Sequence, residues 1–548
     1  MANISQMKRE KMLDFLETLK EQHSDDDSLI AINQIEKELT SKKYGLVWEE
    51  HEEEVDVKMQ THIPVFTEVK GKEIIGDPDS DRYNFLLEGD NLHSLKLLEK
   101  TLKGKVDLIY IDPPYNTGGK DFIYNDKIVG REDTYRHSMW ISFMEKRLKI
   151  ARSLLSSKGA IFISIDDNEN ANLKLLCDEI FGEECFITDV AWRCSDNSNN
   201  NSLKFSEDYN HTLVYAKRSE WKPNFLNDPE KRKHFKNPDN DPKGPWFDGN
   251  PVNNPGLRPN LQFDITTPSG KTIKHPANGW RWSMETIEEK MKTGELRFSD
   301  DETRLIRRTY LRDMKGLPPS NLWTNLDKTS HNRRAKYELK SLFPDVPVTS
   351  LFSTPKPVGF IKYILELSTD SESIICDFFA GSGTTAHAVL ALNKEDGGNR
   401  KFILCTNNEN NICDNMTYPR CKTLATGVCP NGSEYCEKYP SNIKYFKTDF
   451  VDKLNDDLYD ELLAHTKEMI EIQHGIKVDG KKYIMIMDDD EMDKFEKHFS
   501  DYSDLKAVYI NQDVLLSTSQ EKMLADVNTY IIPDCYFDFE LREAGELW

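Results

Sequence analysis

The sequence predicts a large α/β domain, built on a mainly parallel sheet and interrupted by an irregular insertion. Short continuous apolar runs, of which Val106–Ile111 is an example, alternate with stretches of helical periodicity, as expected for strands that helices cover on both faces. The alternation stops near residue 190 and resumes after Thr354. The intervening region is rich in turn-forming and aromatic residues, with 10 of the 24 prolines at 223–276 and six of the nine tryptophans at 192–323.

Each expected element rests on its apolar pattern and on the turn residues that bound it. Residues 4–40 are expected to form one or two amphipathic helices, and a charged linker follows near residues 49–54. The tail combines helical patterns with strand-like ones at 482–487 and 505–510. The elements expected between these ends are strand 85–87, helix 92–98, strand 106–111, helix 134–155, strand 160–165, helix 171–180, strand 188–192, helix 358–367, strand 373–378, helix 384–392 and strand 401–406.

The net charge of −22 is distributed unevenly along the chain. Residues 1–60 carry a net charge of −7 and residues 451–548 carry −14, whereas residues 186–350 carry +5. A polyanionic partner is therefore compatible with the middle of the chain and disfavoured at both ends. The acidic ends are equally compatible with a role in solubility alone.

The composition also excludes several classes of protein. A hydrophobic content of 38% is too high for a disordered chain. No apolar stretch approaches the ~20 residues that cross a membrane, and the first residues lack the apolar core of a secretory signal. The ten cysteines in a chain of this size indicate reduced thiols in a cytosol. The spacing of Cys413, Cys421, Cys429 and Cys436 lacks the close pairs typical of zinc sites, so free thiols are expected there and no metal.

The first motif that carries chemistry is Asp112-Pro113-Pro114-Tyr115, directly after the apolar strand 106–111. Ligands bind at the carboxyl ends of strands in open α/β sheets. The carboxylate of Asp112 and the proline carbonyls are acceptors suited to an exocyclic amino group, and the ring of Tyr115 offers a face for stacking on a base. A Pro-Pro turn alone would only end a strand, but the whole motif after such a strand favours a functional site.

The second motif follows strand 373–378 and reads Asp377-Phe378-Phe379-Ala380-Gly381-Ser382-Gly383-Thr384-Thr385. Glycines permit close approach of the backbone, and the amino end of the following helix supplies free N–H groups to a ligand. The motif is neither a P-loop, because no lysine follows the second glycine, nor a dinucleotide fingerprint, because a third glycine is absent. Alone, it would equally suit a tight strand-to-helix turn.

Together and in this order, the two motifs resemble the beta-class DNA amino-methyltransferases, and more closely the Mod subunits of type III restriction–modification systems. Further segments resemble the Mod family: 87–92, 116–126, 140–148, 159–167, 354–357, 417–420 and 444–450. The resemblance covers about residues 45–200 and 350–450, with the ending 536–546. It implies a Rossmann-like S-adenosylmethionine-dependent methyltransferase sheet, an inserted irregular target-recognition domain, and small N- and C-terminal regions.

The resemblance implies a division of the chain and a role for each motif. Residues 1–55 would be a helical region with a dimer contact, residues 56–189 and 351–450 the catalytic domain, residues 190–350 the target-recognition domain and residues 451–548 an acidic α/β domain. The implied catalytic residues are Asp112, Pro113, Pro114 and Tyr115. The implied cofactor-binding residues are Asp90, Asn91, Lys356, Asp377, Phe378, Phe379, Ala380, Gly381, Ser382, Gly383, Thr384 and Thr385, with Asn407 and Glu409 where the family places a ribose-binding acid.

The implied reaction is transfer of a methyl group from S-adenosylmethionine to N6 of an adenine flipped out of double-stranded DNA, without a metal. Two alternatives stay open: methylation of cytosine N4, which Asp112 disfavours, and a catalytically idle DNA-specificity subunit, which the intact motifs disfavour. The family further implies a homodimer, a separate ATP-dependent Res subunit, no membrane and a prokaryotic cytoplasm. The candidate DNA-binding residues of the basic middle region are Arg304, Arg307, Arg308, Arg312, Arg333, Arg334 and Lys336.

Overall fold

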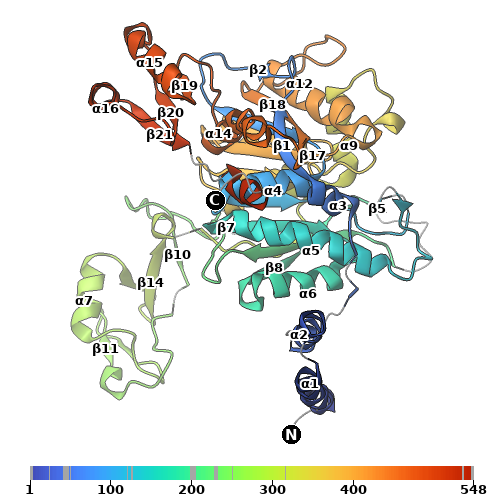
Figure 1. The fold of residues 1–548 in the computed structure, drawn as a ribbon. Coiled ribbons are helices and arrows are strands. Elements are labelled where there is room, and N and C mark those ends of the chain that lie inside the picture. The colour runs from blue at the N-terminus through green and yellow to red at the C-terminus, as the bar shows by residue number, and fades with distance from the viewer. Residues whose placement is uncertain are drawn as a thin grey trace. The chain divides into compact units, whose positions relative to one another are not determined.

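The chain folds into two compact units, which are described separately. Residues 1–221 and 321–548 make up the larger unit, and residues 222–320 the smaller one. The structure is a computed structural model (Figure 1). It describes residues 4–23, 25–40, 48–49, 51–119, 121–124, 127–197, 205–226, 232–249, 251–314, 316–532 and 536–544.

The larger unit is built on an 11-stranded sheet with the order β1-β18-β3-β17-β16-β4-β7-β9-β8-β15, where β2 also pairs with β18. The six strands from β18 to β7 run parallel to their neighbours, whereas β1 and β9 are antiparallel to theirs. The strands are β1 His62–Glu68, β2 Ile74–Ile75, β3 Tyr83–Glu88, β4 Val106–Ile111, β7 Leu155–Ile165, β8 Phe186–Arg193, β9 Tyr209–Ala216, β15 Leu322–Trp323, β16 Ile374–Asp377, β17 Lys401–Thr406 and β18 Asn442–Asp452. A hairpin of β5 Ile123–Tyr124 and β6 Lys127–Ile128 lies apart from this sheet.

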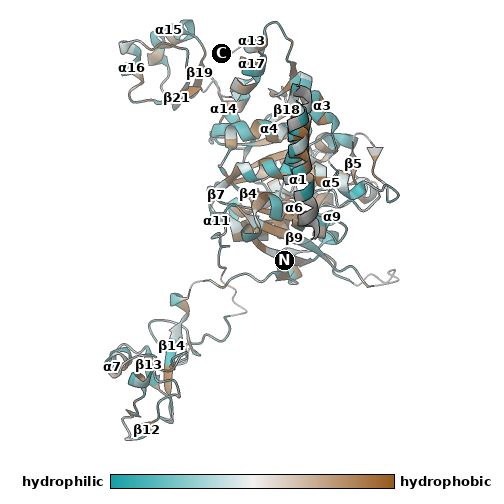
Figure 2. Cartoon of the chain, turned by 60° about the horizontal axis from the view of Figure 1, so that its bottom comes forward, coloured by the Kyte–Doolittle hydropathy of each residue, from teal (hydrophilic) through white to brown (hydrophobic). Residues whose placement is uncertain are grey.

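Helices cover both faces of the parallel strands, and every residue of β3 and β4 is therefore buried. Helices α4, α5 and α6 pack in a row, and α10 packs between α8 and α11. Apolar colour concentrates in the strands and in the helix faces against them (Figure 2). The helices of this part are α3 Glu54–Thr61, α4 Asn91–Leu102, α5 Arg136–Leu154, α6 Asn170–Phe181, α8 Leu326–Thr329, α9 Asn332–Leu342, α10 Val358–Ser368, α11 Thr384–Asp396, α12 Tyr418–Thr426, α13 Leu458–Leu463 and α14 Thr466–His474.

The predicted α/β fold is confirmed, and each strand and helix expected between residues 85 and 406 is present with shifts of a few residues at its ends. Strands β1, β9 and β18 were not expected. β18 is the edge strand of the parallel core, and β1 and β9 flank that core. In these positions, half-exposed and polar or charged side chains interrupt the apolar runs that signal a buried strand.

The smaller unit, residues 222–320, is narrower than the expected insertion of residues 190–350. Strands β8, β9 and β15 and helices α8 and α9 of that range belong to the larger unit. The smaller unit has its own core, which includes Trp280, Ile287 and Leu305. Its elements are β10 Trp246–Asp248, β11 Ile265–Thr266, β12 Thr272–Ile273, α7 Met284–Lys292, β13 Leu296–Phe298 and β14 Leu305–Tyr310.

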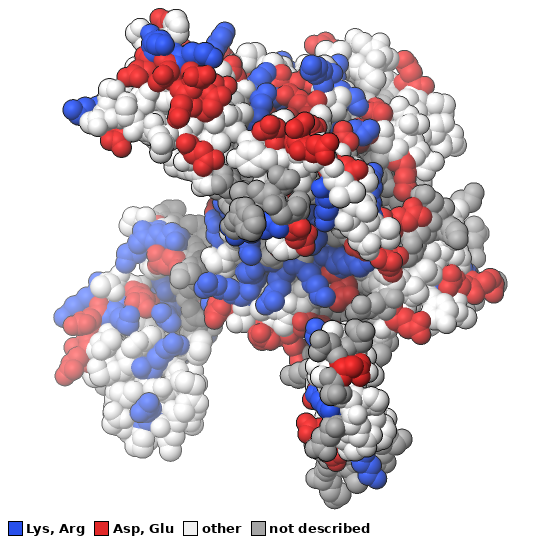
Figure 3. Space-filling model, in the orientation of Figure 1, with Lys and Arg blue, Asp and Glu red and all other residues white. Residues whose placement is uncertain are grey.

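The ends of the chain form the expected elements. Helices α1 Ile4–Gln22 and α2 Asp26–Thr40 lie at the amino end, and a parallel sheet of β19 Tyr483–Ile486, β20 Ala507–Asn511 and β21 Asn528–Ile532 lies near the carboxyl end. Acidic side chains gather over the latter part, around α15 Asp489–Lys497 (Figure 3). Helices α16 Thr518–Leu524 and α17 Asp538–Ala544 complete it. Among the described residues, none of the helices is long and apolar enough to cross a membrane.

Candidate active site

A cavity of about 330 Å³, here called the first cavity, opens at the carboxyl ends of β3, β4, β16 and β17. This is the edge at which open α/β sheets bind ligands. Thirteen of the fourteen candidate cofactor-binding residues line it: Asp90, Asn91, Lys356, Asp377, Phe378, Phe379, Ala380, Gly381, Ser382, Thr384, Thr385, Asn407 and Glu409. The remaining candidate, Gly383, is not among the lining residues, and a Cβ added there would meet the side chain of Thr417 at 3.2 Å. The binding roles of these residues remain predictions.

The turn between β16 and α11 forms one wall of the first cavity. Asp377 holds the turn, because its carboxylate accepts hydrogen bonds from the backbone N–H of Phe379, at 3.0 Å, and from the hydroxyl of Thr385. Burial raises the pKa of Asp377 to about 7, and the nearby carboxylate of Asp112 adds to the rise. Gly381 has φ +49, and a Cβ added there would lie 3.5 Å from the ring of Phe352.

Arg420, which was not predicted as a site residue, supports this turn from behind. Its buried guanidinium donates to the carbonyl of Ser382 at 3.2 Å and to the hydroxyl of Thr384 at 2.9 Å. Thr417 donates to the carbonyl of Gly381 at 2.6 Å. Burial lowers the pKa of Arg420 to about 10. The segment 417–420 resembles the Mod family in sequence, but its position against the turn follows only from the three-dimensional packing.

The Asp112–Tyr115 motif leaves the end of β4 and forms a compact polar cluster with Lys356. The Asp112 carboxylate accepts hydrogen bonds from the Tyr115 hydroxyl at 2.8 Å and from the Lys356 ammonium at 2.6 Å. Lys356 also donates to the Tyr115 oxygen at 2.7 Å. Burial and the Asp112 carboxylate raise the pKa of Tyr115, so its phenol stays protonated at neutral pH and donates to Asp112. Lys356, expected at the cofactor, therefore lies against the Asp112–Tyr115 motif as well.

Two side chains outside the motif fix its backbone. The indole N–H of Trp140, in α5, donates to the carbonyl of Pro114 at 2.7 Å. Asn116 follows the motif with φ +56, a left-handed conformation that asparagine tolerates. Its amide donates to the buried carboxylate of Glu169 at 2.5 Å, and His137 lies 2.6 Å from the same oxygen. No site role was predicted for Trp140, Asn116, Glu169 or His137, because the local sequence around them carries no signal of these contacts.

A second cavity, of about 680 Å³, adjoins the first and is lined by Pro113, Pro114 and Tyr115 among others. Both cavities share Asp112, Lys356 and Phe352 in their walls. The carboxylate of Asp112 thus lies where the first and second cavities meet. An arrangement of this kind brings a group bound in one space next to a group bound in the other.

The seven candidate DNA-binding residues are divided between the two units, four in the smaller unit and three in the larger one. In the smaller unit, Arg308 is mostly buried, with 14% of its side chain exposed, and pairs with Asp239 and with Asp241, the latter at 2.7 Å. The other three candidate arginines of this unit pair more loosely: Arg307 with Glu295, Arg304 with Asp248 and Arg312 with Asp313. In the larger unit, α9 carries Arg333, Arg334 and Lys336, of which Arg333 pairs with Asp196 at 3.0 Å.

The four cysteines considered for zinc are free of disulfide bonds and differ in burial. Cys413, Cys421 and Cys429 are buried and Cys436 is exposed. Burial raises the pKa of Cys413 and of Cys421 to about 12, which disfavours the thiolate that binds metals. In the part of the chain that the structure describes, no group of three or more His, Cys, Asp or Glu side chains could hold a metal ion.

Comparison with known proteins identifies the family. A model of the DNA methylase family matches residues 106–417, more than half of the chain. The chain belongs to the DNA methylase family. The match begins at β4 and ends just before α12, so it includes both motifs and the segment between them.

The relatives of this chain include the expected Mod subunits. The type III restriction-modification enzyme StyLTI Mod subunit of Salmonella typhimurium is 39% identical over 354 residues, which cover 60% of this chain and 53% of that protein. The EcoP15I Mod subunit of Escherichia coli is 32% identical, over 60% of this chain and 59% of that protein. The type II methyltransferase M.KpnI of Klebsiella pneumoniae is 34% identical, over 58% of this chain and 79% of that protein. The resemblance to type III Mod subunits is confirmed, although the chain spans only about half the length of the first two relatives.

Proposed function

We propose that this DNA methylase transfers a methyl group from S-adenosylmethionine to N6 of adenine in double-stranded DNA, as the Mod subunit of a type III restriction–modification system. The observation that carries the proposal is the position of Asp112 between the two cavities. The first cavity would hold the methyl donor and the second the flipped adenine. The relatives named as Mod subunits support the assignment to a type III system.

The first cavity fits S-adenosylmethionine in the chemistry of its walls. Asp90 and Glu409 offer carboxylates to hydroxyl and amino groups, the turn after Asp377 offers backbone N–H groups, and Phe143 and Phe379 offer apolar faces to a purine. Its volume of about 330 Å³ lies in the range of sites for small ligands. When bound, S-adenosylmethionine supplies an electrophilic methyl group on a sulfonium centre.

The residues of the second cavity would position the adenine. The Asp112 carboxylate and the Pro113 carbonyl would accept hydrogen bonds from the N6 amino group and so direct its lone pair toward the first cavity. Tyr115 would stack on the base. Trp140 already holds the Pro114 carbonyl, which keeps the backbone of the motif in place before the base arrives. Because each of these roles is one of orientation, no metal is required for the reaction.

The partners follow from the same proposal. The smaller unit and the neighbouring elements, within residues 190–350, would recognise the DNA sequence, and exposed arginines such as Arg304 would contact phosphates. A homodimer and a separate ATP-dependent Res subunit are proposed on the strength of the Mod relatives. The protein would then act in the cytoplasm of a prokaryote.

Transfer of a labelled methyl group from S-adenosylmethionine to genomic DNA that lacks methylated adenine tests the proposal. N6-methyladenine in the digested DNA is the expected product, and sequencing of the modified sites would give the recognition sequence. N4-methylcytosine would overturn the choice of base. A protein that binds S-adenosylmethionine and DNA but transfers no methyl group, even to DNA that contains the sequence it binds, would favour a catalytically idle specificity subunit.

A further inference from the structure

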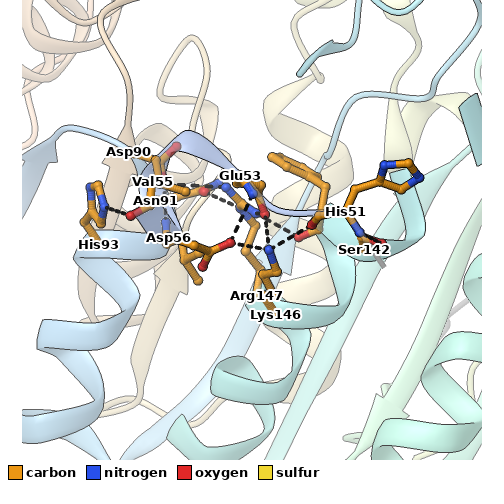
Figure 4. A network of polar contacts seen from close by, with 12 residues as sticks. His51, Glu53, Val55, Asp56, Asp90, Asn91, His93, Ser142, Lys146 and Arg147 are labelled. Carbon is orange, nitrogen blue, oxygen red and sulfur yellow. Dashed lines mark hydrogen bonds and ion pairs between the residues drawn. The ribbon is translucent and has the colours of Figure 1, made fainter. Parts of the chain in front are cut away.

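A short stretch before β1 packs against helices α4 and α5 and is here called the docking segment, residues 51–56. Ser142 and Lys146, one turn apart on α5, hold its beginning: Ser142 accepts from the backbone N–H of His51 at 3.2 Å, and Lys146 donates to the His51 carbonyl at 3.2 Å. Lys146 also pairs with Asp56. On the other side, His93 of α4 lies 3.1 Å from the Val55 carbonyl (Figure 4).

Arg147 stands at the centre of this network, with none of its side chain exposed. Its guanidinium donates to the Glu53 carboxylate at 3.0 Å, to the Asn91 side-chain oxygen at 2.5 Å and to the Phe143 carbonyl at 2.8 Å. It also lies 3.6 Å from the centre of the Phe143 ring. A second carboxylate, that of Asp90, is 3.5 Å away. Figure 4 shows Glu53, Asp90 and Asn91 gathered around Arg147.

Three of the groups that Arg147 touches belong to the wall of the first cavity. Asp90, Asn91 and Phe143 line this cavity, whereas Glu53 and Arg147 do not. Asn91 extends the chain of contacts, because its amide N–H donates to the Phe378 carbonyl at 2.8 Å. Arg147 therefore lies directly behind the cavity and orients the side chain that joins α4 to the turn after β16.

Glu53 and Asp90 share the same buried guanidinium, with Glu53 at Nη1 and Asp90 at Nη2. A buried cation needs a carboxylate partner, and the loss of one partner leaves a large penalty. Glu53 is the nearer partner. Asp90 is the N-cap of α4, where its Oδ1 accepts a hydrogen bond from the backbone N–H of Leu92 at 2.7 Å. If the charge of Glu53 were removed, Asp90 would be the carboxylate left to compensate Arg147, and it would turn toward α5 and away from the cavity.

We propose that Arg147 is a positioning residue for the methyl-donor site, and that Glu53 of the docking segment keeps Asp90 available to that donor. The proposal rests on the function proposed above for the first cavity. It connects the region before β1 to cofactor affinity: the donor binds well only while the docking segment holds Glu53 against Arg147.

The substitution Glu53→Gln tests this, because it preserves shape and removes the charge. S-adenosylmethionine affinity is measured by calorimetry on the full chain, and the melting temperature without ligand is measured alongside. We expect the dissociation constant to rise about tenfold, within the usual range for coupled sites, and kcat at saturating S-adenosylmethionine to change less than twofold. The matched control is Lys149→Met on the same helix, an exposed residue paired with Glu145, which should leave the affinity unchanged.

A double-variant cycle shows whether Glu53 acts through Arg147. If it does, Glu53→Gln combined with Arg147→Met will bind S-adenosylmethionine no more weakly than Arg147→Met alone, and Arg147→Lys replaces Arg147→Met if the latter does not fold. Additive losses, or an unchanged affinity in folded Glu53→Gln, would overturn the proposal while the proposed function stands. A wild-type protein that does not bind S-adenosylmethionine would instead overturn both.

Discussion

The ammonium group of Lys356 lies 2.6 Å from the carboxylate of Asp112, although 244 positions separate the two residues in the sequence. Only 8% of the lysine side chain is exposed. The same ammonium donates to the hydroxyl oxygen of Tyr115, so one cation organises two groups of the Asp112–Tyr115 motif. Lys356 therefore has two candidate roles, at the cofactor and at Asp112, and these differ in their kinetic consequences.

Replacing Lys356 with methionine should reduce kcat for methyl transfer about 100-fold, the scale expected when catalytic groups are misplaced by about 1 Å. The dissociation constant for S-adenosylmethionine should change little, because the main partners of the ammonium are Asp112 and Tyr115. Single-turnover kinetics and calorimetry separate the two effects. A large rise in the dissociation constant with intact kcat would assign Lys356 to the cofactor alone.

Replacing Trp140 with phenylalanine removes the hydrogen bond to the Pro114 carbonyl while keeping an aromatic ring. We expect a loss of about 1 kcal/mol of stability and a lower kcat, because the motif backbone loses a fixed contact. Trp48→Phe is the matched control, since the Trp48 N–H is buried and has no hydrogen-bond partner among the described residues. Equal effects of the two substitutions on kcat would contradict the role given to Trp140.

Replacing Gly381 with valine should weaken S-adenosylmethionine binding at least tenfold, because the branched side chain would enter the first cavity. Backbone strain also follows from φ +49, at a cost of about 1–2 kcal/mol for a non-glycine residue. Gly397→Val controls for strain, since Gly397 has φ +71 at the other end of α11 and open space around it. Calorimetry should show weakened binding only for the Gly381 variant.

The stability of the protein should depend on pH through Asp377. Its pKa is raised from 3.8 to about 7 by burial, so between these values the folded protein retains a proton that the unfolded chain has released. The free energy of unfolding therefore falls as pH rises from about 4 to about 7, and the loss is complete above the folded pKa. Denaturant titrations at pH 5 and pH 8 should show a smaller fall for Asp377→Asn than for the wild type. An identical pH dependence would contradict the assignment.

Arg304 and Arg308 should respond differently to substitution by methionine. Arg308 pairs with Asp239 and Asp241, so its loss leaves these carboxylates without their cation and should lower the melting temperature. Substitution of Arg304, which has 69% of its side chain exposed, should leave the melting temperature unchanged. It should reduce the slope of the logarithm of the DNA-binding constant against the logarithm of salt concentration by the contribution of about one phosphate contact. A reduced salt dependence with unchanged stability in Arg308→Met would identify Arg308 as a phosphate contact instead.

The parallel core and the two motifs could be predicted from the sequence because their signals are local. A continuous apolar run such as Val106–Ile111 implies burial on both faces, and the residues directly after it must emerge at the sheet edge. The contacts of Trp140, Glu169 and Arg420 could not be predicted in this way. Each depends on which helix lies beside which turn, and a lone tryptophan, glutamate or arginine is more often structural than functional.

The arginines of the middle region illustrate the other limit of sequence reasoning. A high density of arginine is equally typical of a phosphate-binding surface and of internal ion pairs. Arg308 is held by Asp239 and Asp241, about 70 positions earlier in the chain, and β10 and β14 lie side by side in one small sheet. Only the pairing of these strands decides which use the arginine has.

The smaller unit joins the larger one at just two places in the sequence, residues 221–222 and 320–321. On the side of the larger unit, β9 precedes the first junction and β15 follows the second, and both strands pair with β8 in the same sheet. A foreign segment with the same two ends could thus be grafted in by recombination without altering a strand of the parallel core. Under the proposed function, such an exchange would give a lineage new DNA targets while the methylation chemistry is inherited intact.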